Sequence, residues 1–568
     1  MPVFFNGRLL ITPAVASVVD DSAMFNRNPS TGNILAIIGQ SAGGQPATAL
    51  RFGSAQEARN VLIDGEALKA IEKAFDPSAQ VNGPSEVVFV RVNPATQAAL
   101  AIKDGSAATV INLLSTGYGR IFNQVKVKIE TGTNKGKKVT SQFGNGVYSQ
   151  DDVYRDALSI TYTGANATAT AAVSQTQLTL TDAAATVIEL SDFPTVANLV
   201  ERINSVPGYA AAVIDGNGEK PTLNALDTLA ATSVKNLTVT VTGVLQAIID
   251  YLNSANEGLL TATRQAGAGT VPANIAFTYL AGATDGNVTN TEWQAAFDAL
   301  QSVDVQWVVP LSSSSSIHAM ADTHVAYMSN VARMERRAFV GGASGTTDVA
   351  AIAAAKAINS DRTAYVHLGF YDYDANGALT LYPPYIAAAM VAGAFAGINP
   401  GTAMTNKTLK VRGLERNLRN PTDTDQLVKG GVLTFENTPQ GYKVVKSIST
   451  FITNGNYNRV EISTGVAVDY VARTVRDALA DLRGAKGSPT VLSEAVSRAD
   501  SALRELARPE PIGVGIIVGD KTNPAYRNIT ATLEGDVVRV EFECSPVIPV
   551  NFILIAIHAR PWSGSVSV

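Results

Sequence analysis

Histidine and serine are the first residues to examine for chemistry, because they supply general bases, nucleophiles and metal ligands. The chain contains His318, His324, His367 and His558. His318 and His324 are six residues apart, which is not the i, i+4 spacing of a helical metal pair. Ser344, in the run GASGT, lacks the G-x-S-x-G frame of a nucleophile elbow. We therefore interpret this run as a turn and the histidines as core or surface residues.

Glycine and aspartate clusters are the next candidates for chemistry. Gly39–Gly44 follows an expected strand, but its glycines do not fit the G-x-G-x-x-G pattern of a dinucleotide loop. Residues 132–138, GTNKGKK, are one residue short of a phosphate loop and are interpreted as a charged hairpin turn. Asp372 and Asp374 favour a solvated turn before Asn376 over a cation site. We predict no catalytic, cofactor-binding or metal-binding residues, and no enzyme activity.

The composition limits the class of protein. The 568 residues allow about two to four domains. Hydrophobic residues make up 46% and charged residues only 16%, so we expect much of the surface to be buried against other copies. The net charge of −5 provides neither a basic footprint for nucleic acid nor a polybasic patch for a membrane.

The cysteine count and the apolar segments indicate the cellular compartment in which the protein is made. Cys544 is the one cysteine, which excludes an internal disulfide and a cysteine-based zinc site, and its place on an apolar strand face indicates a small buried hydrophobe. Residues 1–13 lack a basic n-region and a cleavage site, and the uncharged run 375–406 has an apolar core too short to span a bilayer. We expect a soluble protein that is made in a reducing cytoplasm.

The most informative pattern is at the carboxyl-terminal side of the chain. Residues 537–544 alternate between apolar and polar side chains, as in a strand with one buried face. Residues 551–557, NFILIAI, are apolar on both faces after Asn551, so a strand here must be covered on two sides. The partner is either its own domain or a neighbouring copy. Residues 1–30 are similarly apolar but broken by Pro and Gly, and are predicted to be an extended arm.

Between the arms, strand and helix patterns alternate, which predicts a doubly wound sheet split by a β-rich insertion. Strands are expected at 33–39, 87–92, 303–309, 337–341 and 365–370. Helices are expected at 55–75, 291–300, 317–336, 347–358, 384–397, from a cap at Ser463 or Thr464 to Leu482, and at 488–507. Residues 253–274 are interpreted as a loop. The predicted domains are 1–30 (arm), 31–94 and 271–410 (two parts of the α/β domain), 95–270 (β-rich lobes), 411–548 (α+β domain) and 549–568 (carboxyl-terminal arm strand).

This order of parts resembles the tail sheath proteins of contractile-tailed bacteriophages. The segments that carry the resemblance are NILAIIG (33–39), VVFVRVN (87–93), FPTVANLVERIN (193–204), VDVQWVVP (303–310), YNRVEI (457–462), DYVARTVRDALADL (469–482) and the stretch 537–562. The resemblance implies that the α/β domain has a subtilisin-like fold without protease activity. It also implies a structural, late-expressed virion protein that is assembled in the host cytoplasm.

The resemblance further implies a mechanical function. Sheath copies would form stacked hexameric rings around a tail tube protein, between a baseplate and a tail terminator, without binding nucleic acid or inserting into a membrane. Neighbouring copies would add their arm strands to one subunit's sheet, so that the mesh stays linked. Contraction from a metastable extended state would drive the tube through the host cell envelope for genome ejection.

On this basis we assign two sets of candidate site residues. The inter-subunit arm strands are predicted to use Val3, Phe4, Phe5, Leu9, Ile11, Val15, Val18, Phe552, Leu554, Ile555 and Ile557. The linker hinges are predicted at Asn28, Pro29, Gly32, Pro546 and Pro549.

Two alternative functions remain open from the sequence. One is a hydrolase on the α/β domain, for which Ser344 with His318 or His324 is the best available combination. The other is a different virion or cell-surface lattice protein.

Overall fold

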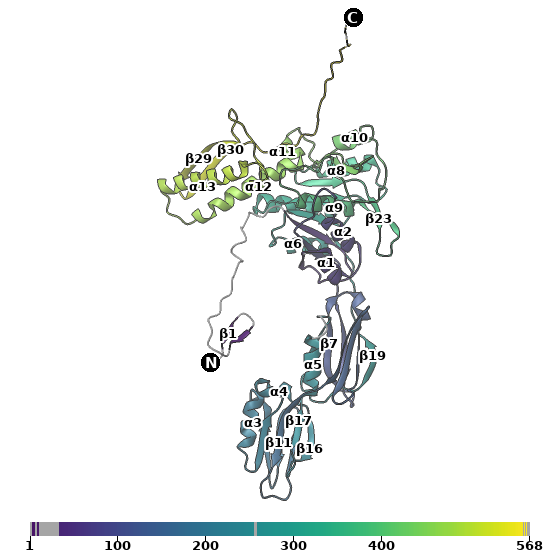
Figure 1. The fold of residues 1–568 in the computed structure, drawn as a ribbon, viewed down its shortest axis with the longest axis vertical. Coiled ribbons are helices and arrows are strands. Elements are labelled where there is room, and N and C mark those ends of the chain that lie inside the picture. The colour runs from purple at the N-terminus through teal and green to yellow at the C-terminus, as the bar shows by residue number, and fades with distance from the viewer. Residues whose placement is uncertain are drawn as a thin grey trace. The chain divides into compact units, whose positions relative to one another are not determined.

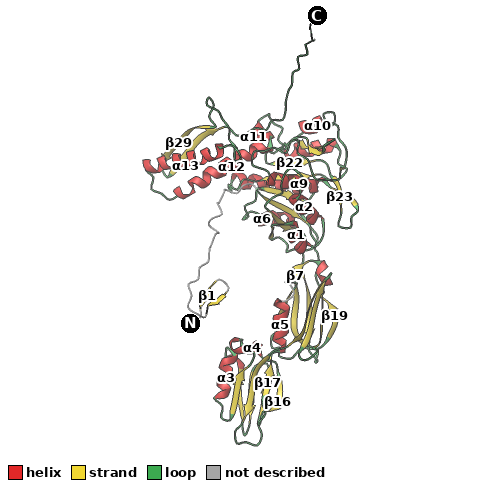
Figure 2. Cartoon of the chain, viewed as in Figure 1, coloured by secondary structure: helices red, strands yellow, loops and turns green. Residues whose placement is uncertain are grey.

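The computed structural model describes residues 3–5, 8–10, 33–254, 258–560, 562 and 564. Figures 1 and 2 show a mixture of helices and strands along the chain, so the predicted α/β multidomain class is confirmed. The chain forms two compact units. The first comprises Met1–Ile37, Ala70–Val88 and Gln301–Val568, and the second comprises Ile38–Lys69 and Phe89–Leu300.

The largest sheet has seven strands in the order β26-β22-β21-β20-β3-β5-β4. Strands β20, β21, β22 and β26 pair in parallel, as the alternation of strands and helices predicts. Every residue of β21 is buried, which is why its sequence, RAFVG, lacks the polar alternation of a half-exposed strand. The strands are β3 (Ile34–Gly39), β4 (Ala49–Phe52), β5 (Glu86–Arg91), β20 (Trp307–Pro310), β21 (Arg337–Gly341), β22 (Thr363–Val366) and β26 (Val432–Leu433).

Helix α9 (Pro384–Gly397) is buried along nearly its whole length and packs on β20, β21 and β22. Its small residues allow a close approach to helix α2 (Glu66–Phe75): a Cβ added to Gly393 would lie 2.4 Å from the carbonyl oxygen of Ala74. Trp307, Phe339 and Phe395 meet in the core between α9 and the sheet.

Several predicted boundaries are wrong. The helix expected over 55–75 is two helices, α1 (Ala55–Leu62) and α2, because Ile63 and Gly65 have φ angles of 66° and 114°. The helix expected over 317–336 is α7 (Ser315–Asn330), and the strand expected over 303–309 is confined to β20. Helix α8 (Asp348–Ile358) follows its prediction closely.

The carboxyl-terminal part of the first unit consists of a helix pair and a hairpin. Helices α12 (Ile462–Leu479) and α13 (Pro489–Ala507) pack together, and strands β29 (Tyr526–Glu534) and β30 (Val537–Cys544) pair antiparallel. The residue that caps α12 is Glu461 rather than Ser463 or Thr464, which lie inside the helix. Smaller elements of this unit are β23 (Phe370–Tyr373), β24 (Leu379–Tyr382), β25 (Gly413–Leu414), α10 (Thr424–Lys429), β27 (Phe435–Thr438), β28 (Gly441–Val444), α11 (Tyr457–Val460) and the 3-10 turn η4 (Ala480–Leu482).

The second unit contains two separate hydrophobic cores. The first core lies among the sheets β18-β7-β6 and β10-β9-β8-β19 and helix α5 (Val244–Ser254). Its strands are β6 (Gln97–Lys103), β7 (Thr109–Tyr118), β8 (Lys126–Thr131), β9 (Lys137–Phe143), β10 (Gly146–Val153), β18 (Leu260–Arg264) and β19 (Ile275–Tyr279). The loop expected over 253–274 is wrong, because it contains β18, which pairs with β7.

The second core of this unit lies among the sheets β15-β11-β17 and β14-β13-β12-β16 and helix α3 (Val196–Asn204). The strands are β11 (Asp156–Tyr162), β12 (Thr170–Val173), β13 (Gln177–Thr181), β14 (Ala185–Glu189), β15 (Tyr209–Val213), β16 (Leu229–Ser233) and β17 (Val239–Thr242). The remaining helical elements of the unit are η1 (Arg120–Gln124), η2 (Leu190–Asp192), η3 (Asn217–Glu219), α4 (Thr222–Ala225) and α6 (Asn290–Ala299).

At the amino-terminal side, β1 (Val3–Phe5) and β2 (Arg8–Leu10) form an antiparallel hairpin. In the part of the chain that the structure describes, none of the helices combines the length and apolarity needed to cross a membrane.

Candidate functional site

The carboxyl-terminal segment exposes an unusual density of apolar side chains. Residues 551–560 form neither helix nor strand and leave the first unit as an extended trace (Figure 1). Leu554 is 94% exposed. The other large apolar residues of the segment are also mostly exposed, namely Val550, Phe552, Ile553, Ile555, Ile557 and Trp562. A contiguous apolar surface of this kind marks an interaction site rather than a finished surface.

The base of this segment is fixed by backbone pairing. The N–H of Val547 donates to the carbonyl of Ile516 over 3.0 Å, and Pro546 forms a bridge with Ile517. The hydroxyl of Thr464, on α12, donates to the carbonyl of Val547 over 3.2 Å. The predicted hinge residue Pro546 is therefore held in place, whereas Pro549 follows this anchored stretch.

A hydrogen bond joins Asn551 to Glu461 at the start of α12. The Nδ2 atom of Asn551 donates to Oε2 of Glu461 over 3.3 Å. Burial raises the pKa of Glu461 to about 7, despite the opposing effects of Asn551, Lys446 and Ser463. We name residues 551–560 the carboxyl-terminal arm.

The hairpin β29–β30 is a two-stranded sheet within the described residues, so each strand has an edge without a strand partner. Its inward face includes Val540, Phe542 and Cys544, which pack only partly buried against the core of α12 and α13. These hairpin side chains therefore keep part of their apolar surface exposed. An exposed strand edge over an apolar layer is a template for a further strand.

A cavity of about 570 Å³ lies beside this hairpin. Its walls come from the end of α12, the start of α13 and the hairpin strands, and its apolar lining is Leu479, Leu482, Val491, Ala495, Leu533, Val538 and Val540. We name this cavity, together with the β29–β30 edges, the hairpin groove. Its volume is sufficient for several apolar side chains.

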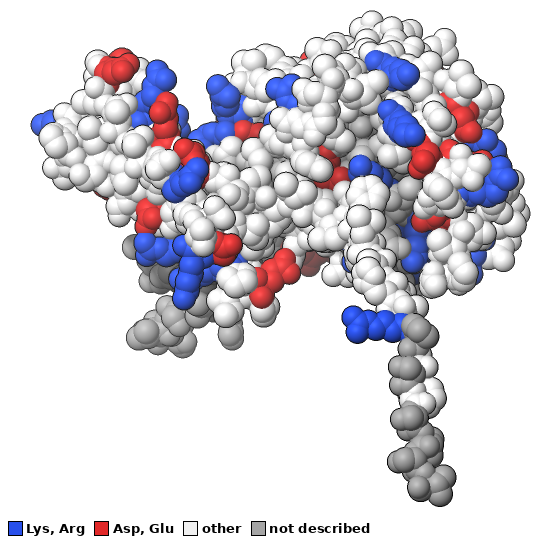
Figure 3. All heavy atoms as spheres, turned by 90° about the horizontal axis from the view of Figure 1, so that it is seen from above, with Lys and Arg blue, Asp and Glu red and all other residues white. Residues whose placement is uncertain are grey.

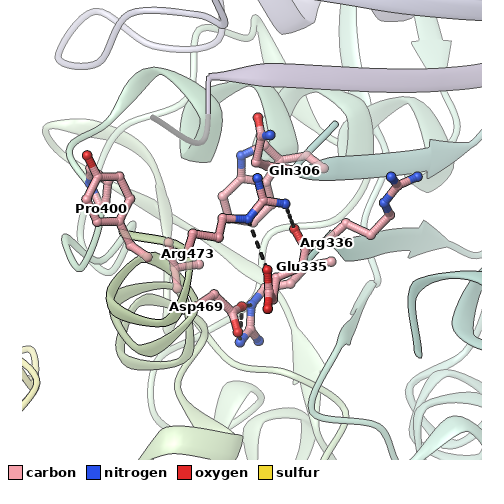
Figure 4. Close-up of a pocket in the computed structure, with 10 residues that line it drawn as sticks. Gln306, Glu335, Arg336, Pro400, Asp469 and Arg473 are labelled. Carbon is pink, nitrogen blue, oxygen red and sulfur yellow. Dashed lines mark hydrogen bonds and ion pairs between the residues drawn. The ribbon is translucent and has the colours of Figure 1, made fainter. Parts of the chain in front are cut away.

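Helix α12 is attached to the seven-stranded sheet by buried ion pairs (Figure 4). Arg473 of α12 contacts Asp304 at 3.1 Å and Glu335 at 3.2 Å. Arg476 binds the same Glu335 at 2.5 Å, and this hydrogen bond raises the pKa of Arg476. The partners lie just before β20 and β21, so α12 is tied to the amino-terminal side of these parallel strands.

A second carboxylate of α12 completes this attachment. Asp469 accepts from Arg337 at 3.0 Å and from Arg362 at 2.6 Å. Burial lowers the pKa of Arg337, and the charge of Asp469 opposes that effect. The cavity between these groups is only about 30 Å³, so it has room for about one water molecule. This arrangement stabilises an internal contact and leaves no space for a substrate.

Some of the other predicted site residues lie in strands, and others lie outside the described residues. Val3, Phe4 and Phe5 lie in β1 and Leu9 lies in β2. The remaining predicted residues lie outside the described residues, namely Ile11, Val15, Val18, Asn28, Pro29 and Gly32.

The hydrolase constellation is not assembled in the described chain. Ser344 is exposed, whereas His318 is buried and contacts the carbonyl of Ser312 through Nε2 at 2.9 Å. The Nε2 atom of His324 lies 3.0 Å from Nη1 of Arg336, which supplies its hydrogen-bond partner. Burial also lowers the pKa of His318.

The turns predicted within residues 132–138 and at Asp374 are confirmed, whereas Asp372 lies in strand β23 and its carboxylate forms an ion pair with Lys73. Residues 132–136 connect β8 to β9, and Asp374 accepts backbone N–H bonds from Asn376 and Ala378. The described residues contain no group of three His, Cys, Asp or Glu side chains arranged to hold a metal ion. On the face seen in Figure 3, acidic and basic side chains are interspersed over a mostly uncharged surface.

Comparison with known proteins agrees with the sequence-based resemblance. Residues 286–450 match the family model of the phage tail sheath protein central domain. The chain is 28% identical to a tail sheath protein of Bacillus phage SP01, over 99% of this chain and 98% of that protein. It is 27% identical to a putative tail sheath protein of Enterococcus phage phiEF24C, over 96% of each chain.

A solved structure gives the same result for the fold. The crystal structure of a sheath tail protein from Listeria innocua aligns with a TM-score of 0.56 and 12% identity, covering 90% of this chain and 92% of that one. These findings confirm the predicted resemblance to tail sheath proteins, and with it the function of a structural tail sheath subunit.

Proposed function

We propose that this chain forms a contractile sheath in which each copy is completed by the arms of its neighbours. The carboxyl-terminal arm of one copy adds as a strand to the hairpin β29–β30 of another and fills the hairpin groove. The amino-terminal hairpin residues Val3–Phe5 and Leu9 belong to the opposite arm, which joins the same mesh. The observation that carries this proposal is the run of exposed apolar side chains beyond Asn551.

The energetics favour association of the arm. Each backbone hydrogen bond of an added strand contributes about 0.5–1.5 kcal/mol, and the apolar area contributes about 25 cal/mol per Å². Both faces of the arm are apolar, so a strand formed by it needs cover on two sides. The hairpin groove supplies one side through Leu482, Val491 and Val538. A further copy, or the tube inside the sheath, supplies the other.

The ion pairs of α12 give the arm a firm attachment. The arm leaves from a base held by Thr464 and Glu461, and the same helix is tied to the large sheet through Asp469 and Arg473. A pull on the arm therefore reaches the large sheet through α12. Rotation during contraction is absorbed after the anchored Val547, at residues 548–550, with Pro549 as the hinge.

The domain division supports the same assembly. The parallel pairs of β20, β21, β22 and β26 and the buried helix α9 support a doubly wound, subtilisin-like domain split between 31–94 and 271–410. The lobes of 95–270 form the insertion. We propose domain 411–548 as the part that accepts neighbouring arms and 549–568 as the part that donates one.

In the proposed assembly, the chain binds other proteins of the tail and catalyses no reaction. Copies stack as hexameric rings around a tail tube protein, with a baseplate and a tail terminator at the ends, in a virion assembled in the host cytoplasm. The extended sheath is metastable, and its contraction drives the tube through the host envelope. Labelling with a serine-directed activity probe should give no signal.

Deletion variants test arm exchange. Removal of residues 1–20, or of 549–568, should leave folded, soluble monomers, whereas the full chain forms tubes in negative-stain electron micrographs. The matched control retains residues 549–568 and replaces Phe552, Leu554, Ile555 and Ile557 with Ser, which keeps the length and removes the apolar surface. Normal assembly of the truncated chains would contradict arm exchange. Sheets or shells in place of tubes would indicate a different lattice protein.

A further inference from the structure

The second unit consists of two lobes that the chain connects twice. We name residues 95–155 and 243–283 the α5 lobe, and residues 156–242 the α3 lobe, after the helix that packs on the core of each. The chain leaves the α5 lobe after Arg155 and returns at Gly243, whose N–H donates to the carbonyl of Arg155 over 2.9 Å. Two adjacent connections of this kind allow one lobe to swing against the other unless further contacts hold it.

The first further contact lies at the amino-terminal end of helix α5. Gly243, the residue before the helix, has no side chain to cap it, and a Cβ there would lie 2.3 Å from the carbonyl oxygen of Ala225 in the α3 lobe. Asp227 of the α3 lobe supplies the cap, and it is 5% exposed. Its carboxylate accepts from the N–H of Val244 over 2.6 Å and from the N–H of Leu245 over 3.1 Å. A carboxylate here satisfies free N–H groups and complements the positive end of the helix dipole.

The second further contact runs in the opposite direction, from the α5 lobe to the α3 lobe. The guanidinium of Arg264, on β18, donates to the carbonyl of Asn224 over 2.6 Å and to that of Leu226 over 3.1 Å. Beside it, the N–H of Thr228 donates to the carbonyl of Gly269 over 2.7 Å. The turn that follows α4 is therefore held by the α5 lobe, and the same turn carries the carboxylate that caps α5.

The charges at this junction support each other. The Asp227 carboxylate also accepts from the hydroxyl of Thr242 over 2.8 Å, so three donors converge on it and the ionised form satisfies them all. Burial raises the pKa of Asp227, and these hydrogen bonds and the charge of Arg264 oppose that effect. Burial likewise lowers the pKa of Arg264, and the charge of Asp227 opposes it. Separation of the lobes would take from each charged group partners that the other lobe provides.

We propose that Asp227 and Arg264 form a reciprocal latch that makes the α3 lobe and the α5 lobe one rigid body. Both are positioning residues: Asp227 fixes the start of α5 against the α3 lobe, and Arg264 fixes the turn that carries Asp227. The latch prevents the swing that the two chain connections alone would allow. A displacement of either lobe is therefore transmitted to the other. The inference is independent of arm exchange, because it uses no residue of either arm.

Double electron–electron resonance between one spin label on each lobe measures this rigidity. The labels are placed by Val147→Cys on β10 and Val187→Cys on β14, in a Cys544→Ser background of the full chain, below the concentration at which light scattering detects assembly. These valines are 56% and 51% exposed, so the labels stay outside both cores. The latch predicts one narrow distance distribution, with a width set by the labels. A broad distribution, or several distances, in this chain would overturn the inference.

Variants of the two side chains separate the latch from general stability. Asp227→Ala should widen the distance distribution about twofold, and Arg264→Gln should widen it in the same way, because the lobes then swing about their two connections. The double variant should be about as broad as the broader single variant, since either loss opens the latch. The matched control is Asp192→Ala, which removes an exposed carboxylate from the α3 lobe and should leave the width unchanged.

Circular dichroism establishes that each variant is folded, and the distribution of the labelled chain without these substitutions decides the question if a variant is not. Folded Asp227→Ala and Arg264→Gln chains whose distributions stay narrow would overturn the inference, and so would widths that add in the double variant. The measurement uses unassembled chains, so a failure to form tubes would contradict the proposed function and leave the latch intact.

Discussion

Arg337, the first residue of β21, donates to Asp469 of α12 with Nη2 and Oδ2 3.0 Å apart. The same carboxylate accepts from Arg362, which directly precedes β22. One side chain thus ties the helix that carries the arm to two neighbouring parallel strands. In the proposed sheath, this contact passes tension from the arm to the large sheet.

Replacing Asp469 with Ala should lower the free energy of unfolding by about 3–5 kcal/mol, because it leaves buried guanidinium groups unpaired. Chemical denaturation measures the change. The control is Asp481→Ala in η4, between α12 and α13: its side chain is 90% exposed and 3.9 Å from Arg498, so the loss should be at most about 1 kcal/mol. Equal losses of unfolding free energy for both variants would show that the buried ion pairs of Asp469 stabilise the fold no more than an exposed pair does.

Gly465→Ala should destabilise the chain, although Ala is normally the better helix former by about 1 kcal/mol. A Cβ at Gly465 would lie 2.3 Å from Nη2 of Arg337 and would displace it from Asp469. We expect a loss of about 1–3 kcal/mol in thermal or chemical unfolding. Gly455→Ala, where no atom lies within 4 Å of the new Cβ, should be nearly neutral. A stabilised Gly465→Ala variant would contradict the packing described for α12.

Leu554→Asp should separate folding from assembly. The side chain is 94% exposed in the single chain, so the denaturation midpoint should stay unchanged. The concentration needed for tube formation should rise at least about tenfold, since a charge replaces a side chain that assembly buries. Leu554→Met keeps the apolar area and should assemble normally. If Leu554→Asp assembles at the wild-type concentration, residue 554 is not buried between copies.

The free energy of unfolding should fall as the pH rises through the titration of Glu461. Its folded pKa is raised to about 7 from an ordinary value of 4.5, so its stabilising contribution is complete below about pH 4.5 and is lost near pH 7. The difference between wild type and Glu461→Gln, which does not titrate, should change by at most about 3 kcal/mol over this range. If the unfolding free energies of the two proteins change in parallel with pH, the titration of Glu461 does not cause the change.

Helices and strands whose apolar residues form a clear pattern were predictable from the sequence. Strand β21 and helix α9 occur where their apolar runs indicate. Both segments lack a polar face, so the sequence predicts buried elements, and both are buried in the structure. The break between α1 and α2 was missed, since the apolar spacing continues across it. It depends on left-handed backbone at Ile63, a residue type that gives no warning of such a conformation.

The site was predictable only in part. The apolar arm is visible in the sequence because its pattern lacks a polar face. The pair Arg337–Asp469 joins residues far apart in the chain, and no local pattern indicates it. Residue preference places the cap of α12 at Ser463 or Thr464, whereas the N-cap position is Glu461, whose side chain makes no capping hydrogen bond. The strand predicted over 551–557 is not formed in the single chain, and in the proposed sheath it would form against another copy.

Electron cryo-microscopy of the assembled chain tests the central claim most directly. The account predicts that residues 552–560 form a strand hydrogen-bonded to the β29–β30 hairpin of a neighbouring copy, with apolar side chains in its hairpin groove. Density in which this segment folds back onto its own copy, while tubes form through other surfaces, would contradict it.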